Sequence, residues 1–219
     1  MGVAATRWLQ DVGPLLAGAR MTILVSLASI ALGFTLGVLI NQARKVKIAV
    51  VQYAIAAYIS FFRGTPLLVQ LLMFFYLPST AGINLPPVLA AILTLSMNTS
   101  AFQSEILRAG FESIPKGQIE SARVFGIPGH AILAHIEIPS VVRYTLPGLV
   151  SELIDIVKIS SLISVISVTE IMRAGQELVS TTYRPLEIYI LVGLVYLLLT
   201  SGLSLLGRAV EARFARAYR

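Results

Sequence analysis

Charged side chains inside apolar sequence are the residues of this chain with the most chemistry to offer. Glu152, Asp155 and Lys158 recur every third residue within the apolar stretch 145–168, so on a helix they form a slanting stripe about 120° wide. A charged side chain at membrane depth costs about 2.5–3.5 kcal/mol on insertion scales, which makes each one a candidate functional group. We expect this helix to lie centrally, at a pore or a dimer axis. The alternative is that Asp155 and Lys158 only neutralise each other as an i, i+3 pair.

A second apolar stretch, 88–107, also carries a polar face. Asn98 and Glu105 share that face with Phe102, at i, i+4 and i+7 spacing. The polar groups of these two stretches are candidates to line a route for polar solutes. The competing interpretation is that they only satisfy contacts between helices.

Other kinds of chemistry have no matching motif in the sequence. There is no GxxxxGK[ST] phosphate loop and no Gly-Lys dipeptide, which excludes nucleotide binding of the usual kind. GxSxG is absent, and without cysteine there is no disulfide, thiolate nucleophile or cysteine metal site. His130 and His135 show no HExxH pattern. We therefore expect no enzymatic reaction, no cofactor and no metal centre in this chain.

The composition indicates that lipid, rather than water, surrounds the chain. Of 219 residues, 56% are hydrophobic and 13% are charged, and the mean hydropathy is +0.82. Soluble domains usually carry about 25% charged residues. The formal net charge is +6, but the cations flank apolar runs, which is typical of topology signals beside a membrane. We expect a membrane protein with no nucleic-acid partner.

Apolar runs of roughly 20 residues predict five membrane-spanning helices in one all-α, polytopic domain over residues 1–219. The predicted spans are 21–40, 60–77, 88–107, 145–168 and 186–206. The run RGTP interrupts the apolar sequence near the start of the second span. We interpret Pro66 as part of a helix start, and Arg63 as a headgroup anchor rather than a ligand-binding residue.

The first span contains two glycines at small-xxx-small spacing, Gly33 and Gly37. Such a step lets helix backbones approach closely. The alternative is that these are ordinary membrane glycines.

Five spans place the two termini on opposite sides of the membrane, and the cations indicate which. With the amino terminus outside, twelve cations fall in inner segments, namely Arg44, Lys45, Lys47, Arg63, Arg108, Lys116, Arg123, Arg143, Arg208, Arg213, Arg216 and Arg219. Four fall in outer segments, namely Arg7, Arg20, Arg173 and Arg184. Because lysine and arginine are enriched in cytoplasmic loops, we expect the amino terminus outside and the carboxyl terminus in the cytoplasm.

With this topology, segment 108–144 lies in the cytoplasm. It is far longer than the roughly 2–8 residues that a passive connection between two helices needs. Ser113 can act as an N-cap, and Gly126 fits the C′ position, where the chain takes a positive φ. Pro128 then prevents the helix from resuming. The sequence predicts a short helix over Pro115–Phe125, outside the bilayer.

One face of this short helix is apolar, with Ile119, Ala122 and Phe125 at i, i+3 and i+6. A helix of this length is marginal in water unless something packs on it. Glu120 sits near the positive end of the helix dipole and can cap its own helix.

The centre of the segment, GQIESARVFGIPGHAILAHIEIP, resembles the signature loop of permease subunits of ATP-binding-cassette (ABC) importers for polar amino acids. That loop has a Glu-Ala-Ala run, a glycine after three further residues, and a later run that ends in proline. Glu120, Ala122, Gly126, Ile136 and Pro139 match it, and Ser121 stands in place of the middle alanine. Three further stretches resemble the amino-acid branch: FFRGTPLLVQ, EILRAGFESIPKGQ and VKISSLISVISVTEI.

The resemblance implies a multi-pass permease of the bacterial inner membrane that imports polar amino acids and leaves ATP hydrolysis to a partner. The implied partners are ABC ATPase subunits, a second permease subunit (an identical copy or a close relative), and a periplasmic or lipid-anchored amino-acid-binding protein. The short helix would then be a coupling helix that docks in the ATPase. The residues expected to make or position this contact are Gly117, Gln118, Glu120, Ser121, Ala122, Gly126 and Pro139.

An amino-acid substrate presents an ammonium and a carboxylate, so its route needs partners for both. Glu105 and Glu152 are candidates for the ammonium or a cationic side chain, and Asn98, Ser100 and Ser161 for the carboxylate. The full set of predicted pathway residues is Asn98, Ser100, Glu105, Glu152, Asp155, Lys158 and Ser161. The acidic groups favour a cationic amino acid, while glutamine, glutamate and cystine stay open.

Two other functional classes are alternatives: a secondary transporter driven by an ion gradient, and a channel or scaffold subunit without energy coupling. Secondary transporters commonly contain inverted repeats, and the sequence shows no internal repeat. Inhibition of uptake by vanadate rather than by a protonophore would indicate ATPase coupling. Substitution of Glu120 and Gly126 should uncouple a permease but leave a channel or scaffold working.

Overall fold

The computed structural model describes the backbone of residues 2–217 and the side chains of residues 11–214, and every regular element in these ranges is a helix. The α-helices are α1 Gly2–Ala43, α2 Ala49–Gly64, α3 Leu67–Thr80, α4 Pro87–Glu112, α5 Lys116–Val124, α6 Gly129–Ile132, α7 Ile138–Ile159, α8 Ile171–Thr182 and α9 Pro185–Ala217. A π-helical turn, η1 Leu133–Glu137, precedes α7, and a 3-10 helix, η2 Ser160–Ile166, follows it. The predicted all-α class is confirmed.

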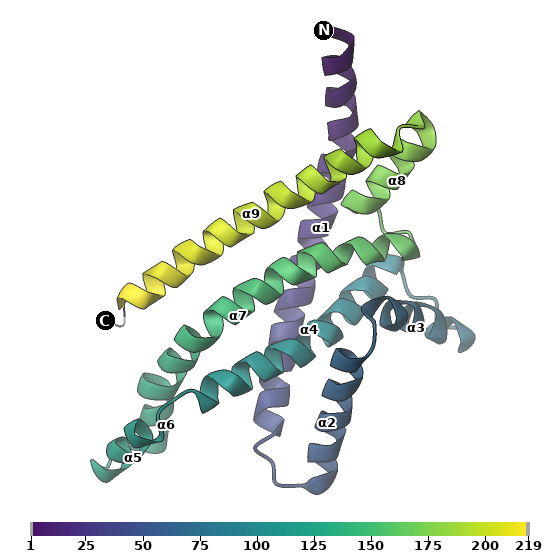
Figure 1. The fold of residues 1–219 in the computed structure, drawn as a ribbon. Helices are drawn as coiled ribbons and strands as arrows, with labels where there is room; N and C mark the ends of the chain where they lie inside the picture. The colour runs from purple at the N-terminus through teal and green to yellow at the C-terminus, as the bar shows by residue number, and fades with distance from the viewer. Residues whose placement is uncertain (1, 218–219) are drawn as a thin grey trace.

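The long helices cross one another in an open bundle (Figure 1). Helix α1 packs most extensively against α4, and α7 contacts both α4 and α9. At one end of α7 lie α5 and α6, and at the other end lies α8 (Figure 1). The segment between the predicted third and fourth spans is therefore held at the opposite end of the molecule from α8.

Two glycines allow α1 and α4 to approach closely. A Cβ atom at Gly33 would lie 2.2 Å from Thr99 Cγ2 and 3.1 Å from the Ser96 carbonyl oxygen. At Gly37 it would lie 3.2 Å from the Ser100 carbonyl oxygen. Because a side chain at Gly33 would push the helices apart, the predicted role of this small-xxx-small step in close packing is confirmed.

The predicted second span, 60–77, is not one continuous helix. Helix α2 ends at Gly64, α3 begins at Leu67, and the two are bent by 112°. Pro66 cannot donate a backbone hydrogen bond and disfavours helical geometry in the residue before it. Gln70 fixes the bend, because its Nε2 donates to the carbonyl oxygens of Phe62 and Thr65, each at 3.0 Å. The sequence predicts a helix start at Pro66, and α3 does begin directly after it, while α2 before it runs in a different direction.

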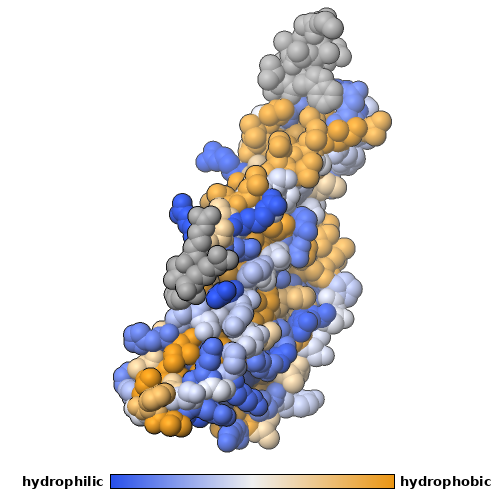
Figure 2. Space-filling view, turned by 60° about the vertical axis from the view of Figure 1, so that its left-hand side comes forward, coloured by the Kyte–Doolittle hydropathy of each residue, from blue (hydrophilic) through white to orange (hydrophobic). Residues whose placement is uncertain are grey.

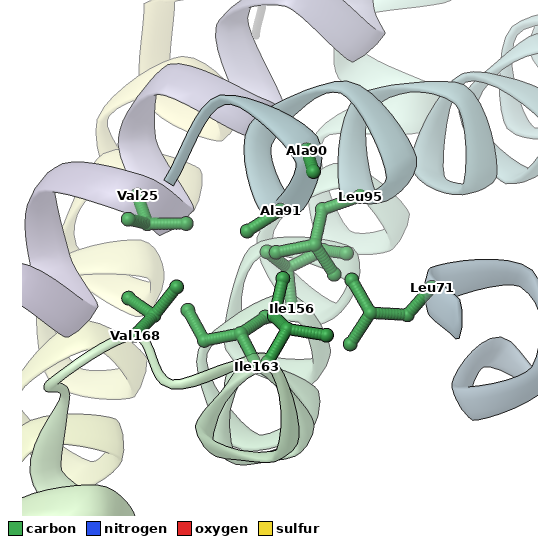
Figure 3. Close-up of a cluster of buried hydrophobic side chains, with 9 residues drawn as sticks. Val25, Leu71, Ala90, Ala91, Leu95, Ile156, Ile163 and Val168 are labelled. Atoms are coloured by element: carbon green, nitrogen blue, oxygen red, sulfur yellow. The ribbon is translucent and has the colours of Figure 1, made fainter. Parts of the chain in front are cut away.

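The predicted fourth span, 145–168, is also interrupted. Helix α7 ends at Ile159, the chain tightens into η2, and Ser167 adopts a left-handed conformation with φ 64°. The reason is tertiary packing, since this turn places Ile163 in a shared core. Figure 3 shows the buried side chains of this core, which come from α1, α3, α4, α7, η2 and the turn after η2. The labelled residues are Val25, Leu71, Ala90, Ala91, Leu95, Ile156, Ile163 and Val168.

The predicted spans 21–40, 88–107 and 186–206 lie inside α1, α4 and α9. By length and composition, two helices are apolar enough to cross a membrane, Asp11–Ala43 and Pro185–Phe214, and a third crossing is possible if the bent pair α2–α3 counts as one. Hydrophobic residues also gather over the upper part of the surface in Figure 2. Helices α4 and α7 carry more polar residues, so composition alone does not establish five crossings.

A buried carboxylate joins α8 to α1 and α9. Glu170 is fully buried, accepts a hydrogen bond from the Arg173 amide at 2.8 Å, and accepts another from the Tyr196 hydroxyl at 2.5 Å. Burial raises the pKa of the Glu170 carboxyl, and these hydrogen bonds oppose that rise. A Cβ at Gly18 would lie 2.8 Å from the Glu170 backbone, so this junction also needs a glycine on α1.

Candidate functional site

The short helix predicted over 115–125 is present as α5, within one residue at each end. Its start differs from the prediction in one respect. Ser113 ends α4 instead of capping α5, and its hydroxyl donates back to the Ala109 carbonyl oxygen at 2.7 Å. Pro115 occupies the N-cap position of α5, without a side-chain cap.

The end of α5 is a Schellman motif. The Ile127 amide donates to the Ala122 carbonyl oxygen at 3.1 Å, and the Gly126 amide donates to the Arg123 carbonyl oxygen at 2.9 Å. Gly126 has φ +72°, the positive value that the sequence predicts, and glycine adopts it without the steric cost that a side chain would bring. The chain therefore leaves α5 along a defined path.

One side of α5 packs on the bundle and the other faces outward. Ala122 is buried, and Ile119 packs with Leu107, Ile114 and Val141. Phe125, expected on this inner face, is instead 83% exposed, because the helix ends at Val124 and its periodicity stops there. The structure thus leaves an exposed apolar tip at the end of α5.

The other predicted contact residues of this segment lie on or near its outer surface. Glu120 makes no hydrogen bond or ion pair with the rest of the described chain, and α5 has no side-chain cap. The alternative that Glu120 caps its own helix therefore finds no support. Residues of the set that are exposed are Gly117, Gln118, Glu120, Ser121 and Gly126.

Gln118 and Pro139, at opposite ends of the signature loop, line one cavity of about 240 Å³ together with Arg143. A second cavity of about 310 Å³ borders α5 and includes Glu120 in its wall. The loop therefore folds back on itself and presents α5 beside two hollows.

A buried amide network ties α4 to the bend between α2 and α3. Asn98 Nδ2 donates to the Phe62 carbonyl oxygen at 3.0 Å and to Gln70 Oε1 at 2.9 Å. Next to it, the Tyr58 hydroxyl lies 2.7 Å from Ser100 Oγ and donates to the Met97 carbonyl oxygen at 2.9 Å. Asn98 and Ser100, predicted as pathway residues, are buried and bonded within the chain.

Glu152 connects α7 to the same part of α4. Its Oε1 accepts a hydrogen bond from the Thr99 hydroxyl at 2.7 Å, and Gln103 Nε2 donates to that hydroxyl at 3.0 Å. Glu152 is half-buried, and no lysine or arginine pairs with it in the described part of the chain. Neither oxygen of its carboxylate thus has a cationic partner among the described residues.

Glu105, by contrast, is surrounded by arginines. One of its oxygens pairs with Arg44 at the end of α1. The other accepts hydrogen bonds from Arg108 at 2.8 and 3.0 Å, and Arg63 lies 3.8 Å away. These contacts raise the pKa of Arg108 above its ordinary value, first through the hydrogen bond to Glu105 and next through that to Glu112. The carboxylate of Glu105 is already neutralised within the chain.

Asp155 and Lys158 form the predicted i, i+3 pair, with 2.6 Å between Oδ1 and Nζ. Both side chains are more than half exposed. They belong to an exposed face of α7 at helical spacing, with the polar residues Tyr144 and Ser151 and the apolar Pro147. Ser161, which lies in η2, is half-buried.

Asn98 and Ser100 thus bond to α2 and the bend after it, and Glu105 lies beside Arg63 of the same helix. Glu152 instead reaches α4 through Thr99, and Asp155 and Lys158 lie on the exposed face of α7. Sequence reasoning missed Gln70, Tyr58 and Arg44, whose partners are far along the chain. Gln70 was the one detectable signal, as a lone amide in an apolar run. Within the described residues, no group of three or more His, Cys, Asp or Glu side chains could hold a metal ion.

Comparison with known proteins gives a consistent match over most of the chain. A family model described as "Binding-protein-dependent transport system inner membrane component" matches residues 29–216. The arginine transport system permease protein ArtQ of Bacillus subtilis is 34% identical over 91% of this chain and 91% of its own. The L-cystine transport system permease protein TcyB of the same organism is 34% identical over 94% of this chain and 89% of its own.

Solved structures share the same fold. A crystal structure of an amino acid ABC transporter with histidines aligns with a TM-score of 0.90 and 31% identity, covering 95% of this chain and 97% of that one. An inward-facing structure of the MetNI methionine ABC transporter aligns with a TM-score of 0.72 and 19% identity, over 96% and 98% of the two chains. The second likeness concerns the fold alone.

Proposed function

The chain belongs to the family of binding-protein-dependent transport system inner membrane components, and from this premise we propose that it is the permease subunit of an ABC importer for polar amino acids. It provides the membrane passage, and a separate ATPase subunit hydrolyses ATP. The direction is import across the bacterial inner membrane.

The observation that carries this proposal is the geometry of α5. The helix is anchored on its inner side through Ile119 and Ala122 and closed by a Schellman motif at Gly126. Its outer side carries the exposed Phe125 and Glu120, and Glu120 pairs with no side chain in the described part of the chain. A rigid, half-anchored helix can transmit a rotation from a partner, whereas a flexible loop would absorb it. Gly117, Gln118, Ser121 and Pro139 complete the proposed ATPase contact.

We further propose five membrane crossings, with the amino terminus outside and the carboxyl terminus in the cytoplasm. The bent pair α2–α3 acts as the second crossing, and α7 with η2 as the fourth. Helix α4 has 26 residues and α7 has 22, lengths of about 39 and 33 Å that suffice for a hydrocarbon core of about 30 Å. The cation distribution supports the orientation.

The polar face of α7 supports a second permease subunit as partner. Asp155 and Lys158 are exposed on a helix of membrane length, and charged groups facing lipid are costly. We propose that this face, continued by Ser161, lines the passage between two permease subunits. An external amino-acid-binding protein delivers the substrate to that passage.

Within the passage, Glu152 is the best candidate to receive the ammonium or a cationic side chain of the substrate. It has a hydroxyl partner but no cationic one among the described residues, whereas Glu105 is paired with arginines. Asn98 and Ser100 hold the wall of the passage through their bonds to α2. These assignments favour a cationic amino acid as substrate.

Reconstitution with the ATPase and binding-protein partners tests this function. We expect uptake of labelled amino acids that requires ATP, stops with vanadate and survives a protonophore. Because the sequence contains no cysteine, Ser121→Cys introduces a single thiol, which should cross-link to the ATPase. The matched control Ser180→Cys, exposed on α8 at the other end, should not.

Glu120→Ala should reduce uptake and substrate-stimulated ATP hydrolysis together, while Glu177→Ala, an exposed acid on α8, should leave both near the wild-type level. Uptake that collapses with a protonophore, or an unaffected Glu120→Ala transporter, would refute the coupled mechanism.

A further inference from the structure

A cavity of about 400 Å³ lies along α2, at the end of the molecule where α1 stops. Its wall is built from three helical segments: Arg44 just after α1, Glu105 of α4, and a face of α2 that includes Arg63. Neither the proposed ATPase contact nor the proposed passage uses it.

The cavity carries a surplus of positive charge. Two arginines and one glutamate line it, and both oxygens of Glu105 are bonded, one to Arg44 and the other to Arg108. Arg108 adds nothing to the surplus, since it also pairs with Glu112 at 2.8 Å. One guanidinium therefore remains without a full counter-charge.

That guanidinium belongs to Arg63. Its Nη1 is 3.8 Å from Glu105 Oε2, beyond hydrogen-bond length, and the side chain is 44% exposed. Its central carbon lies 5.3 Å from the centroid of the Phe102 ring, which orients the guanidinium without using its donors. Arg63 side-chain nitrogens donate no hydrogen bond within the described part of the chain, so a fork of N–H donors is available to an anion.

The rest of the wall has an amphipathic character. Ser60 contributes an exposed hydroxyl, while Ile55, Ala56 and Ile59 form an aliphatic strip on the same side of α2. The amide nitrogen of Gln52 is already engaged, since it donates to the Arg44 and Val46 carbonyl oxygens at 2.7 Å. The cavity thus offers a cationic end beside an apolar strip, which suits an amphiphile with an anionic head.

The position of the cavity fits the depth of lipid headgroups. Arg44 directly follows Asp11–Ala43, one of the two helices that are long and apolar enough to span a membrane. Lys45 and Lys47 are exposed in the same connection. Basic pockets at the end of membrane helices attract anionic lipid headgroups.

We propose that this cavity binds the phosphate of an anionic phospholipid. Arg63 is the principal ligand, the Ser60 hydroxyl is a second donor, and the glycerol and the start of an acyl chain lie along the aliphatic strip. Inorganic phosphate shares the same charged oxygens but has no apolar part, so it is the other source of this ligand chemistry.

The test uses the intact permease–ATPase complex in detergent and counts bound lipids by native mass spectrometry. We expect phosphatidylglycerol to be retained about tenfold better than phosphatidylcholine. A ratio of this size corresponds to the binding free energy of one charge-assisted hydrogen bond. Arg63→Gln should abolish this preference. Arg173→Gln, a matched arginine that is 37% exposed on α8, should keep it.

Inorganic phosphate is added in a separate arm. If it competes with phosphatidylglycerol and raises the melting temperature of the wild type but not of Arg63→Gln, the site binds phosphate itself. If only the lipid binds, the apolar strip contributes and the source is the membrane. Both results support a phosphate site at Arg63.

Equal retention of the two lipids by the wild type would overturn the proposal, as would an unchanged preference in Arg63→Gln. If Arg63→Gln does not assemble, Ser60→Leu fills the cavity and keeps every charge. A complex with Ser60→Leu that retains the full preference would equally reject the site. Binding is the readout, so failure here leaves the transport function untouched.

Discussion

Helices α4 and α7 both carry polar side chains along lengths sufficient to cross a membrane, but they place them differently. On α4, the polar residues Thr94, Ser96, Asn98, Thr99, Ser100, Gln103 and Ser104 are buried. They are bonded to the bend after α2, to α7 or to their own helix. On α7, the polar face around Asp155 and Lys158 is exposed, and within the described residues these two charges pair with each other alone.

This difference separates two uses of polar groups in an apolar protein. A buried and bonded polar group fixes how the helices of one subunit fit together. An exposed one at membrane depth remains costly until another surface or water covers it. The α4 residues therefore build this subunit, and the α7 face requires something outside it. Mutations can test the contrast, from those with the largest expected effect on the stability of the subunit to those with the smallest.

The largest effect is expected where α1 meets the buried face of α4. Gly33→Leu places a side chain where even a Cβ would lie 2.2 Å from Thr99 Cγ2, and overpacking of this severity should cost about 3 kcal/mol or more. We expect a loss of folded protein, measured as yield and melting temperature of the purified permease in detergent.

Gly193→Leu is the matched control, because no atom lies within 4 Å of a Cβ at that position on α9. It should fold as well as the wild type. If both variants behaved alike, close packing of α1 on α4 would not be what organises the bundle.

The next effect concerns the amide network of α4. Asn98→Leu leaves Gln70 Oε1 without its donor and the Phe62 carbonyl oxygen with the Gln70 amide alone, which should destabilise the permease by about 1–3 kcal/mol. Gln70→Leu also removes the donor to the Phe62 and Thr65 carbonyl oxygens. The double variant Asn98→Leu, Gln70→Leu should lose less than the sum of the two single losses, since the bond between these two side chains is lost in each single variant. Additive losses in thermal unfolding would argue against direct coupling.

Glu152 bridges the two helices, and its substitution should separate stability from transport. Glu152→Gln keeps an acceptor for the Thr99 hydroxyl, so the melting temperature should change by the equivalent of less than about 1 kcal/mol. If the carboxylate receives a substrate ammonium, the KM for uptake should rise about tenfold or more. An unchanged KM would mean that Glu152 has a structural role and does not bind the substrate.

The smallest effect on the subunit is expected on the exposed face of α7. Asp155→Asn should change its stability by less than about 0.5 kcal/mol, because the pair with Lys158 is exposed. Transport by the assembled complex should nevertheless fall, if this face meets a partner or the substrate.

Exchanging the two charges, Asp155→Lys with Lys158→Asp, sharpens the same test. The exchanged pair can still neutralise itself, so wild-type transport would mean that mutual neutralisation is its only task. Reduced transport by a complex that assembles normally would point to contacts beyond this chain.

The features that sequence predicted well are those with local signals. Helix α5 lies within one residue of its expected range, because Pro115 before it and Gly126 after it act on the residues next to them. The Gly33–Gly37 step was recognisable for the same reason. Its partner helix, however, could only be found in the structure.

Features that depend on distant partners were missed. Glu105 was expected to have a free carboxylate, but Arg44, 61 residues earlier, occupies one of its oxygens. The predicted helix 145–168 breaks at Ser160, because Ile163 packs in a core shared with α1, α3 and α4. Hydropathy marks apolar stretches, but it does not show where an apolar helix must turn to fill a gap between others.

The bend between α2 and α3 has a consequence for the depth at which α3 lies in the bilayer. Helix α2 has 16 residues, a rise of about 24 Å, which is less than a hydrocarbon core of about 30 Å. With 112° between the two directions, an upright α2 leaves α3 nearly parallel to the membrane plane, with Tyr76 and Leu77 exposed on it. A spin label at Leu77 should then sit at a shallow depth, where polar relaxation agents reach it more readily than one at Leu198 in the middle of α9.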